Sequence, residues 1–259
     1  HTYNNGKGVL TFNKDITSVG SYAFYNCSTL KAITLPSTIT SIGDYTFYDC
    51  SNLESISVPN NLSSIGDGAF RNCTSLLDID IPQSVSSIGA FAFFGCVSLP
   101  TVDDIRYAGS CAAEAVDKTK ATYKLKEGTR FISSTFENCY NLTSFSIPSS
   151  IVEIGDYAFC MCTSLSYVGI PDSIEIIGKG AFYGCKSIVN ITIPESVTRI
   201  KGSAFSSCAG LLNVKIPVKV KKIEGNSFDY CTNLVDITIG ENVYSIEDFA
   251  FNGCTKLAN

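Results

Sequence analysis

A Phe-x-x-Cys motif recurs along this chain with a period of 23 residues, and this spacing constrains the fold more than any other feature. Three residues before each of ten cysteines stands a Phe, and three residues after each stands Leu or Ile. A fixed period of roughly 20 to 50 residues is typical of repeat proteins, in which each unit packs only on its neighbours. The ten cysteines are Cys27, Cys50, Cys73, Cys96, Cys139, Cys162, Cys185, Cys208, Cys231 and Cys254.

The whole unit reads L-x-x-I-x-I-P-x-x-V-x-x-I-G-x-x-A-F-x-x-C-x-x, and its first part has the leucine-rich-repeat spacing. In the second unit these first positions are Leu53, Ile56 and Val58. Alternate residues of a strand share a face, so the Ile-x-Ile pair is predicted to point inward from a short strand that stops at Pro59. The apolar residues three apart after Pro predict a second short strand or turn, followed by a helical or 3-10 turn.

A single unit is too small to bury its own apolar side chains, whereas stacked units share one core. We therefore predict a repeat solenoid of the leucine-rich-repeat type, β-rich with short helical or 3-10 turns. About ten 23-residue units would form one domain over residues 1–259, with a parallel sheet of Ile-x-Ile strands on the concave face. Gly often follows the last Ile of the unit, as Gly43 follows Ile42. Lys201, Glu224 and Glu247 take this position in other units, so it does not require a positive φ.

The twelve cysteines allow three interpretations. A metal site needs several ligands around one point, which one sulfur per unit does not provide. Disulfides between neighbouring units remain geometrically open, but ten equivalent positions favour buried free thiols that pack beneath the Phe residues. Cys111 and Cys160 lie outside the repeated position, and Cys160 stands where other units carry Tyr25 or Tyr48. We predict that these two are exposed surface thiols, with a redox or linking role as the alternative.

One unit is irregular. The segment from about residue 103 to 122 lacks the motif, and the unit that follows, with Tyr123, Leu125 and Phe131, is one residue short. We predict an excursion, with a hairpin as its candidate form, that grows from one edge of the solenoid. A tolerated insertion is the favoured interpretation, because lengthening a loop costs little. The alternative is a binding feature, since insertions in repeat proteins often mark the binding face.

Two sets of outward side chains are candidates for a partner surface. The first set lies beside the Phe-x-x-Cys turn and is aromatic; the alternative is that these rings only lean on one another between units. The second set lies on the Ile-x-Ile strands, where the acidic residues are either solvated charges or Ca²⁺ ligands, although no D-x-D-x-D-G loop is present. The candidates are Tyr22, Tyr25, Tyr45, Tyr48, Phe91, Phe94, Tyr157 and Tyr183 in the first set, and Asp78, Asp80, Tyr167 and Lys215 in the second.

Features that enzymes require are missing from the sequence. The only histidine is His1, which removes Ser-His-Asp and Cys-His pairs as well as H-E-x-x-H. There is no phosphate-binding or dinucleotide-binding glycine loop. A solenoid filled with side chains also lacks a deep pocket in which the pKa of a carboxyl group could be raised. We predict no catalysis, no cofactor and no metal.

Charge and hydropathy narrow the range of possible partners further. The net charge is −5 without a dense basic face, so nucleic acid is excluded, and no run of 18 apolar residues exists to enter a membrane. Residues 1–8 contain neither Met nor a signal-like apolar stretch, and the array stops without a polar cap. We expect a fragment or trimmed form that continues beyond Asn259 or packs on a neighbour there. The oligomeric state stays open.

The phrase I-P-x-x-V-x-x-I-G-x-x-A-F-x-x-C-x-x-L, as at 81–99 and 170–188, resembles the BspA-like leucine-rich-repeat family, also called the Treponema pallidum type. The likeness covers the chain apart from the insertion and the first eight residues. Members are mostly secreted or surface-anchored proteins of gut and oral bacteria, with relatives in some protozoan parasites. The resemblance implies an extracellular or cell-surface adhesion or recognition module that binds a protein or glycan on host or microbial surfaces. The alternative is a structural spacer or accessory domain that presents another domain of a larger surface protein.

Overall fold

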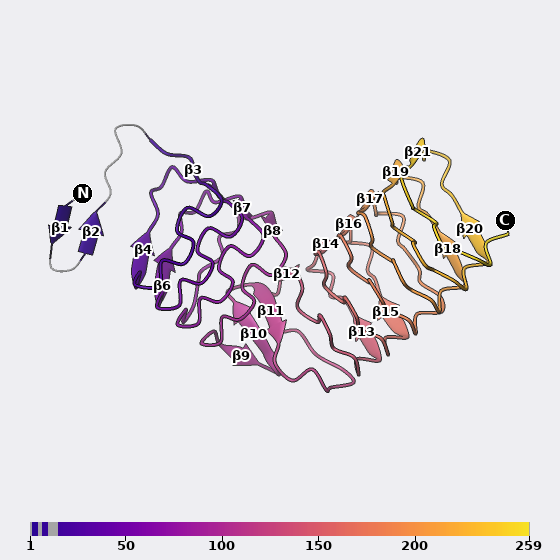
Figure 1. The fold of residues 1–259 in the computed structure, drawn as a ribbon, viewed down its shortest axis with the longest axis horizontal. Helices are drawn as coiled ribbons and strands as arrows, with labels where there is room; N and C mark the ends of the chain where they lie inside the picture. Colours follow the sequence, from indigo (N-terminus) through magenta and orange to yellow (C-terminus); the bar gives the residue numbers. More distant parts are fainter. Residues whose placement is uncertain (1, 5–6, 10–14, 259) are drawn as a thin grey trace.

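The structure of the protein is a computed structural model, which describes residues 2–4, 7–9 and 15–258. Successive 23-residue units form coils that stack into a solenoid bent into an open V (Figure 1). Near the N-terminus, β1 (Thr2–Asn4) and β2 (Lys7–Val9) form an antiparallel pair. His1 and Asn259, which entered the sequence predictions, lie outside the described residues.

The concave side of the V is lined by two-residue strands, one from nearly every coil (Figure 1). These strands pair in parallel one unit apart, so that Ile65 lies between Ile42 and Ile88. They form a four-stranded sheet, most of a seven-stranded sheet and a separate pair. The concave strands are β3 (Ser18–Val19), β5 (Ser41–Ile42), β7 (Ser64–Ile65), β8 (Ser87–Ile88), β12 (Phe131–Ile132), β14 (Glu153–Ile154), β16 (Ile176–Ile177), β17 (Arg199–Ile200), β19 (Lys222–Ile223) and β21 (Ser245–Ile246).

The Ile-x-Ile strands lie on the opposite, convex side, so the parallel sheet on the concave face is present but is built from other residues than we predicted (Figure 1). Coils are farther apart on the outside of a bend, whereas ladder hydrogen bonds need strands about 4.8 Å apart. The convex ladder is therefore interrupted and joins strands only in pairs. The pairs are β4 (Ala32–Thr34) with β6 (Ser55–Ser57), β13 (Ser144–Ser146) with β15 (Tyr167–Gly169), and β18 (Asn213–Lys215) with β20 (Asp236–Thr238), while β9 (Thr101–Val102) joins the seven-stranded sheet.

The irregular segment is a β-hairpin built into the stack. Its strands β10 (Ile105–Ala108) and β11 (Cys111–Ala115) are antiparallel, β10 also pairs with β9, and β11 pairs in parallel with β12. Because β9 lies on the convex side and β12 on the concave side, the hairpin crosses the interior at the vertex of the V (Figure 1). The hairpin form is confirmed, and the predicted position at an edge is wrong.

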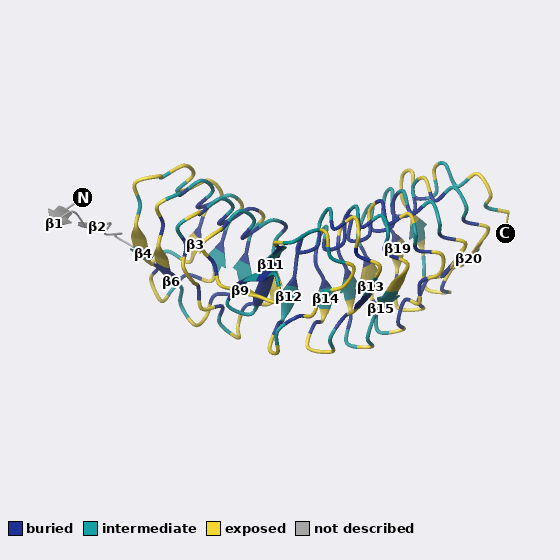
Figure 2. Ribbon diagram, turned by 90° about the horizontal axis from the view of Figure 1, so that it is seen from below, coloured by how far each residue is buried: buried dark blue, intermediate teal, exposed yellow. Residues whose placement is uncertain are grey.

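The hairpin divides the buried side chains into two cores, which corrects the single continuous core that stacked repeats predict. In β11, Cys111 and Ala113 pack on the N-terminal coils, whereas Ala112 and Ala115 pack on the C-terminal coils. Successive side chains of a strand point to opposite faces, so the hairpin is a partition with one core on each side. Figure 2 shows buried residues running through the inside of both arms.

No helix occurs in any stretch that the structure describes, which corrects the expected helical or 3-10 turns. The apolar residues three apart come instead from tight turns, in which Cys50 N–H donates to Phe47 O at 3.1 Å and Leu53 N–H donates to Cys50 O at 3.0 Å. Asp49 has a φ of 57°, and a left-handed residue at this point interrupts a right-handed helix. A spacing of three is common to both kinds of turn, so the sequence pattern does not separate them.

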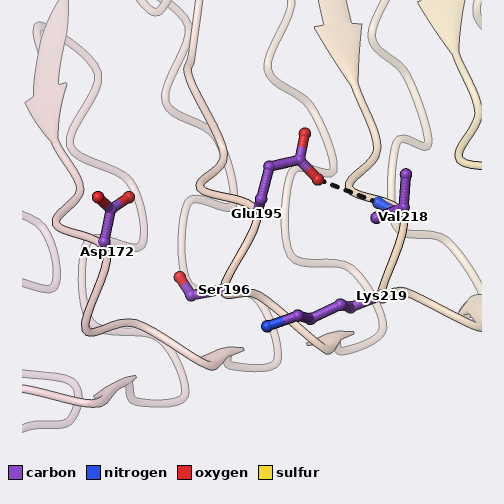
Figure 3. Close-up of a pocket in the computed structure, with 5 residues that line it drawn as sticks. All are labelled: Asp172, Glu195, Ser196, Val218 and Lys219. Atoms are coloured by element: carbon purple, nitrogen blue, oxygen red, sulfur yellow. Dashed lines mark hydrogen bonds between the residues drawn. The ribbon is translucent and has the colours of Figure 1, made fainter.

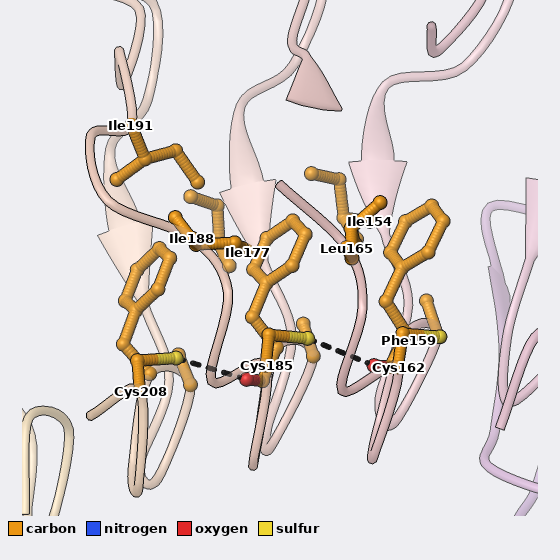
Figure 4. Packing of buried hydrophobic residues seen from close by; sticks show 14 of the residues in the cluster. Ile154, Phe159, Cys162, Leu165, Ile177, Cys185, Ile188, Ile191 and Cys208 are labelled. Atoms are coloured by element: carbon orange, nitrogen blue, oxygen red, sulfur yellow. Dashed lines mark hydrogen bonds between the residues drawn. The ribbon is translucent and has the colours of Figure 1, made fainter. Parts of the chain in front are cut away.

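The Phe and Cys columns are buried as predicted, with partial exposure at their ends. Phe182 stacks between Phe159 and Phe205, with ring centroids 5.4 and 5.3 Å away. Thiols of this column donate to the carbonyl of the Phe in the preceding coil, as from Cys185 Sγ to Phe159 O at 3.1 Å (Figure 4). All twelve cysteines are free, so the packing interpretation is confirmed.

Cys111 and Cys160 are buried too, and the prediction that they are surface thiols is wrong. Cys111 faces the N-terminal core from the hairpin. Cys160 is only 8% exposed, because its short side chain stands between the longer Glu137 and Tyr183, which occupy the same position in the adjoining coils. Burial raises the pKa of Cys111 to about 12 and that of Cys160 to about 11. Both therefore remain weakly reactive thiols at neutral pH.

Candidate partner surface

Two columns of side chains flank the buried Phe column and lie toward the surface: the residue two before each Phe and the residue directly after it. The residue two before Phe has a positive φ in all ten described coils, for example 53° at Tyr45. This turn lets Phe47 point inward while Tyr45 and Tyr48 stay at the surface. We call the aromatic residues in contact along these columns the aromatic ridge, which comprises Tyr22, Tyr25, Tyr45, Tyr48, Phe91, Phe94 and Tyr157.

Four tyrosines form the N-terminal part of the ridge. Tyr22 stacks on Tyr45 with ring centroids 5.3 Å apart, and Tyr25 stacks on Tyr48 at 5.0 Å. Within each coil the two rings are tilted and 5.8 Å apart. The ring of Tyr45 also lies over the next coil, where a Cβ on Gly68 would come within 2.6 Å of it. These four candidates from the sequence are therefore in mutual contact.

The second part of the ridge bridges the two arms of the V. Phe91 from the N-terminal arm stacks on Tyr157 from the C-terminal arm at 5.7 Å. Ser134 stands between them in the column, and its small side chain leaves room for the two rings to meet. Phe91 N–H donates to Ser134 Oγ at 3.2 Å, and that hydroxyl donates to Asp156 O at 3.1 Å. Phe94 packs edge-on against Phe91 at 5.9 Å.

The stacking decides what the ridge presents to solvent. Tyr22 and Tyr25 are 57% and 47% exposed, whereas the other ridge residues are half-buried by their neighbours. Stacking covers one face of Tyr22 and one face of Tyr25, on Tyr45 and Tyr48 respectively. The rings do lean on one another, as the simpler interpretation had it, in two clusters that are separated by the coil of Gly68 and Arg71.

The remaining candidates lie elsewhere. Tyr183 is exposed in the same column, but it has no aromatic ring in contact with it among the described residues. Asp78, Asp80, Tyr167 and Lys215 are exposed on the convex side, away from the ridge. The two sets therefore belong to different faces of the solenoid and do not form one site. Lys215 is already engaged, because its ammonium is 2.6 Å from Glu195.

A shallow groove on the concave face was missed by the sequence analysis. It has a volume of about 450 Å³. Its floor is formed by the Ser residues of β5, β7 and β8 and by the Gly residue that follows each of these strands. Asp44 and Asp67 form one wall and accept backbone hydrogen bonds from the next coil, at 2.9 and 2.8 Å. At its far end Lys201 lies 2.9 Å from Glu153 and 3.1 Å from Asp156. The recurring Ser-Ile-Gly-Asp tetrapeptide is the signal that marks this groove.

The glycines of this floor occupy the repeat position at which Lys201, Glu224 and Glu247 stand in other coils. Gly43 has no left-handed φ, but a Cβ there would lie 2.5 Å from the backbone nitrogen of Ser21. The requirement in the N-terminal arm is therefore close approach of neighbouring coils. Burial raises the pKa of Asp67 above its usual value, and the hydrogen bond from Ala90 acts in the opposite direction.

A second hollow lies in the turns that follow the prolines (Figure 3). Its volume is about 660 Å³, and Val218 N–H donates to Glu195 across it at 3.3 Å. The sequence has a short basic run, Lys219-Val220-Lys221-Lys222. Lys219 lines this hollow, whereas Lys222 lies near Glu247 at 3.8 Å. The run is thus divided between two surroundings and forms no basic patch. Within the described ranges, no group of three or more His, Cys, Asp or Glu side chains is arranged to hold a metal ion.

Coils of parallel strands and turns, repeated every 23 residues around Leu, Ile, Phe and Cys columns, define a leucine-rich-repeat solenoid. The family model for the BspA type leucine rich repeat region matches residues 4–107 and 129–258 in six copies. The chain belongs to this family. The unmatched stretch, 108–128, contains β11 of the hairpin. Repeat proteins of this family are generally non-catalytic, and they are associated with surface and protein-interaction roles.

Solved structures agree with this assignment. The chain is 29% identical to a leucine rich cell surface protein from Faecalibacterium prausnitzii A2-165, with a TM-score of 0.55 over 93% of this chain and 66% of that one. It shares its fold, at 24% identity and a TM-score of 0.50, with a leucine-rich repeat protein from Eubacterium ventriosum, over 95% of this chain and 70% of that one. The chain thus spans just under two thirds of the Faecalibacterium protein. No curated protein matches the sequence.

None of the elements in the described part of the chain is a helix long and apolar enough to span a bilayer.

Proposed function

We propose that this chain is a non-catalytic recognition module of an extracellular, cell-surface protein and that its aromatic ridge contacts a protein partner. Similarity to the Faecalibacterium cell surface protein supports the location. The observation that carries the proposal is the ridge itself, in which a cluster of four tyrosines, with Tyr22 and Tyr25 about half exposed, is followed along the same columns by Arg71 and a second cluster of three aromatic residues. Exposed aromatic clusters on a soluble protein often mark a site of protein interaction.

The chemistry of the ridge favours a protein over a glycan. Tyr supplies a large contact area at a low cost in conformational entropy, and it is enriched among residues that dominate binding energies. The coil-to-coil stacking also holds each ring in place before a partner arrives, as for Tyr25 on Tyr48 at 5.0 Å. The phenol hydroxyls can also donate and accept hydrogen bonds with side chains and backbone of a protein.

The test is a binding screen of the purified chain against arrays of matrix proteins and glycans, repeated with a Tyr22→Ser/Tyr25→Ser variant. The array already carries Ser203 and Ser206 at the two equivalent positions of another coil, so Ser is compatible with this turn. We expect saturable binding to a protein that weakens at least about ten-fold in the variant. Tyr167→Ser, on the convex face, is the matched control and should bind like the wild type.

Two outcomes would overturn the proposal. Saturable binding that Tyr167→Ser removes and the ridge variant retains would move the site to the convex face. Absence of any saturable partner for the folded chain would favour the spacer alternative, in which the stacked coils only hold another domain away from a surface.

A further inference from the structure

Arg71 is the one arginine of the four in this chain that makes no hydrogen bond or ion pair among the described residues. Arg106 lies 2.8 Å from Glu114, and Arg199 lies 2.6 Å from Glu224. The guanidinium of Arg130 donates to three backbone carbonyls of the neighbouring arm. Arginine side chains normally donate hydrogen bonds from their five N–H groups to such partners. An unpaired arginine within the ridge therefore calls for an explanation.

The position of Arg71 is fixed by aromatic rings. It occupies the column directly after Phe, between Tyr48 and Phe94 of the adjoining coils. Its Cζ atom lies 5.4 Å from the ring centroid of Phe91 and 5.1 Å from that of Phe94. Contacts of this kind orient the guanidinium plane before any partner arrives.

The guanidinium is closed on one edge and open on the other. Its Nε atom is buried and has no hydrogen-bond partner. The two terminal nitrogens also make no hydrogen bond, yet they are not among the buried unpaired atoms, so they are open to solvent. This arrangement presents the fork of terminal N–H groups that a carboxylate accepts in bidentate fashion.

The surroundings keep this spot positive in a chain of net charge −5. Lys118 Nζ lies 5.7 Å from the ring centroid of Phe94 and donates to the backbone carbonyl of Glu137 at 2.9 Å. The Glu137 carboxylate forms no ion pair with either cation within the part of the chain that the structure describes. Burial raises the pKa of Glu137, while the charges of Lys118 and Arg71 act to lower it.

We propose that Arg71 receives an Asp or Glu side chain of the protein that docks on the aromatic ridge, with Lys118 adding a second positive charge. This inference rests on the proposed recognition function and adds the chemistry of the partner. A carboxylate is the complement of a pre-oriented, unpaired guanidinium. An acidic peptide segment fits better than an acidic glycan, because Arg71 and Tyr157 already lie on Phe91, and Arg71 and Lys118 already lie on Phe94.

The experiment uses a displayed library of random peptides, selected on the wild-type chain and counter-selected on Tyr22→Ser/Tyr25→Ser. Selected peptides are synthesised, and their affinities are measured for the wild type, Arg71→Gln and Arg199→Gln. Gln suits the site because the same column carries Ser206, Asp229 and Asn252. Arg199, 58% exposed on the concave face, is the matched control for loss of one positive charge.

We expect the peptides to share an Asp or Glu at one position and to lose at least ten-fold in affinity for Arg71→Gln, with no change for Arg199→Gln. Replacing the shared peptide carboxylate by its amide should cost as much for the wild type and nothing further for Arg71→Gln. Ridge-dependent peptides without an acidic residue, or equal affinity for Arg71→Gln, would overturn the inference and leave the ridge proposal standing. Failure to select any ridge-dependent peptide would count against both.

An acidic glycan is the competing occupant. The same variants are therefore tested against uronic-acid and sulfated oligosaccharides. Binding of these glycans that needs Arg71, at an affinity above that of the selected peptides, would refute the protein partner proposed here.

Discussion

Raising the pH above about 9 should destabilise this solenoid, because its buried thiols resist ionisation in the folded state. Burial raises the pKa of Cys50, Cys111 and Cys208 to about 12, and that of Cys160 to about 11. In the unfolded chain a thiol has a pKa of about 8.5. A folded-state pKa above the unfolded one means that the stabilising contribution is complete at neutral pH and is lost as the pH rises past about 9.

The size of the effect follows from the number of thiols. Between about pH 9 and 11, each such thiol lowers the free energy of unfolding by about 1.4 kcal/mol per pH unit. Four of them give a slope of about 5 to 6 kcal/mol per unit. A domain of ordinary stability, roughly 5–15 kcal/mol, should therefore unfold within one to three units above pH 9.

The assay is urea unfolding followed by circular dichroism at intervals from pH 7 to 10 with a reductant present. A matched Cys208→Ala chain should be less stable at pH 7, but its slope above pH 9 should be smaller by about 1.4 kcal/mol per unit. The slope is independent of the stability lost through the cavity. Equal free energies of unfolding at pH 8 and pH 10 would show that the thiols are hydrated in the folded state, and the argument from their burial would fail.

Two further predictions concern packing. Phe182→Ala should lower the free energy of unfolding by about 4–5 kcal/mol, since the ring is fully buried between two others. Phe24→Ala should lower it by about 2 kcal/mol, since this ring is half-exposed and has one stacked partner. Urea denaturation measures both losses, and equal losses would contradict the argument that the Phe column is buried by its stacking. Ala113→Leu and Ala112→Leu should each overpack one core by about 1–3 kcal/mol. Hydrogen exchange should then quicken mainly in residues 15–100 for Ala113→Leu and mainly in 123–258 for Ala112→Leu, and the same pattern for both would refute the partition.

The repeat architecture followed from the sequence because each column is defined many times over. Ten Phe-x-x-Cys motifs in one register predict which side chains face inward, and the burial of Phe47, Cys50 and Leu53 agrees. Curvature was not predictable in the same way. It depends on the relative widths of the two sides of a coil, and both sides carry apolar residues that point into the core. The concave side was therefore assigned to the wrong strands.

The predictions for Cys111 and Cys160 were wrong for a second reason: a repeat pattern predicts only the features that every coil shares. Cys111 sits in a unique hairpin, and its burial depends on a core that forms on each face of β11. Cys160 is covered by side chains that differ from coil to coil. The sequence shows the ridge as a column of aromatic residues that Arg71 interrupts, but it does not show that no neighbour accepts the N–H groups of Arg71.

The hairpin bears on recognition although it contributes none of the aromatic ridge. Two coils of a straight stack would lie about 10 Å apart, yet Phe91 and Tyr157 meet at 5.7 Å across Ser134 at the vertex. Their contact depends on the angle between the arms, which is held by the partition and by Arg130, whose guanidinium donates to carbonyls of Pro82, Gln83 and Val85. The ring of Phe91 in turn helps to orient Arg71. A change inside the hairpin that opens the V should therefore weaken binding at the ridge without touching any residue that contacts the partner.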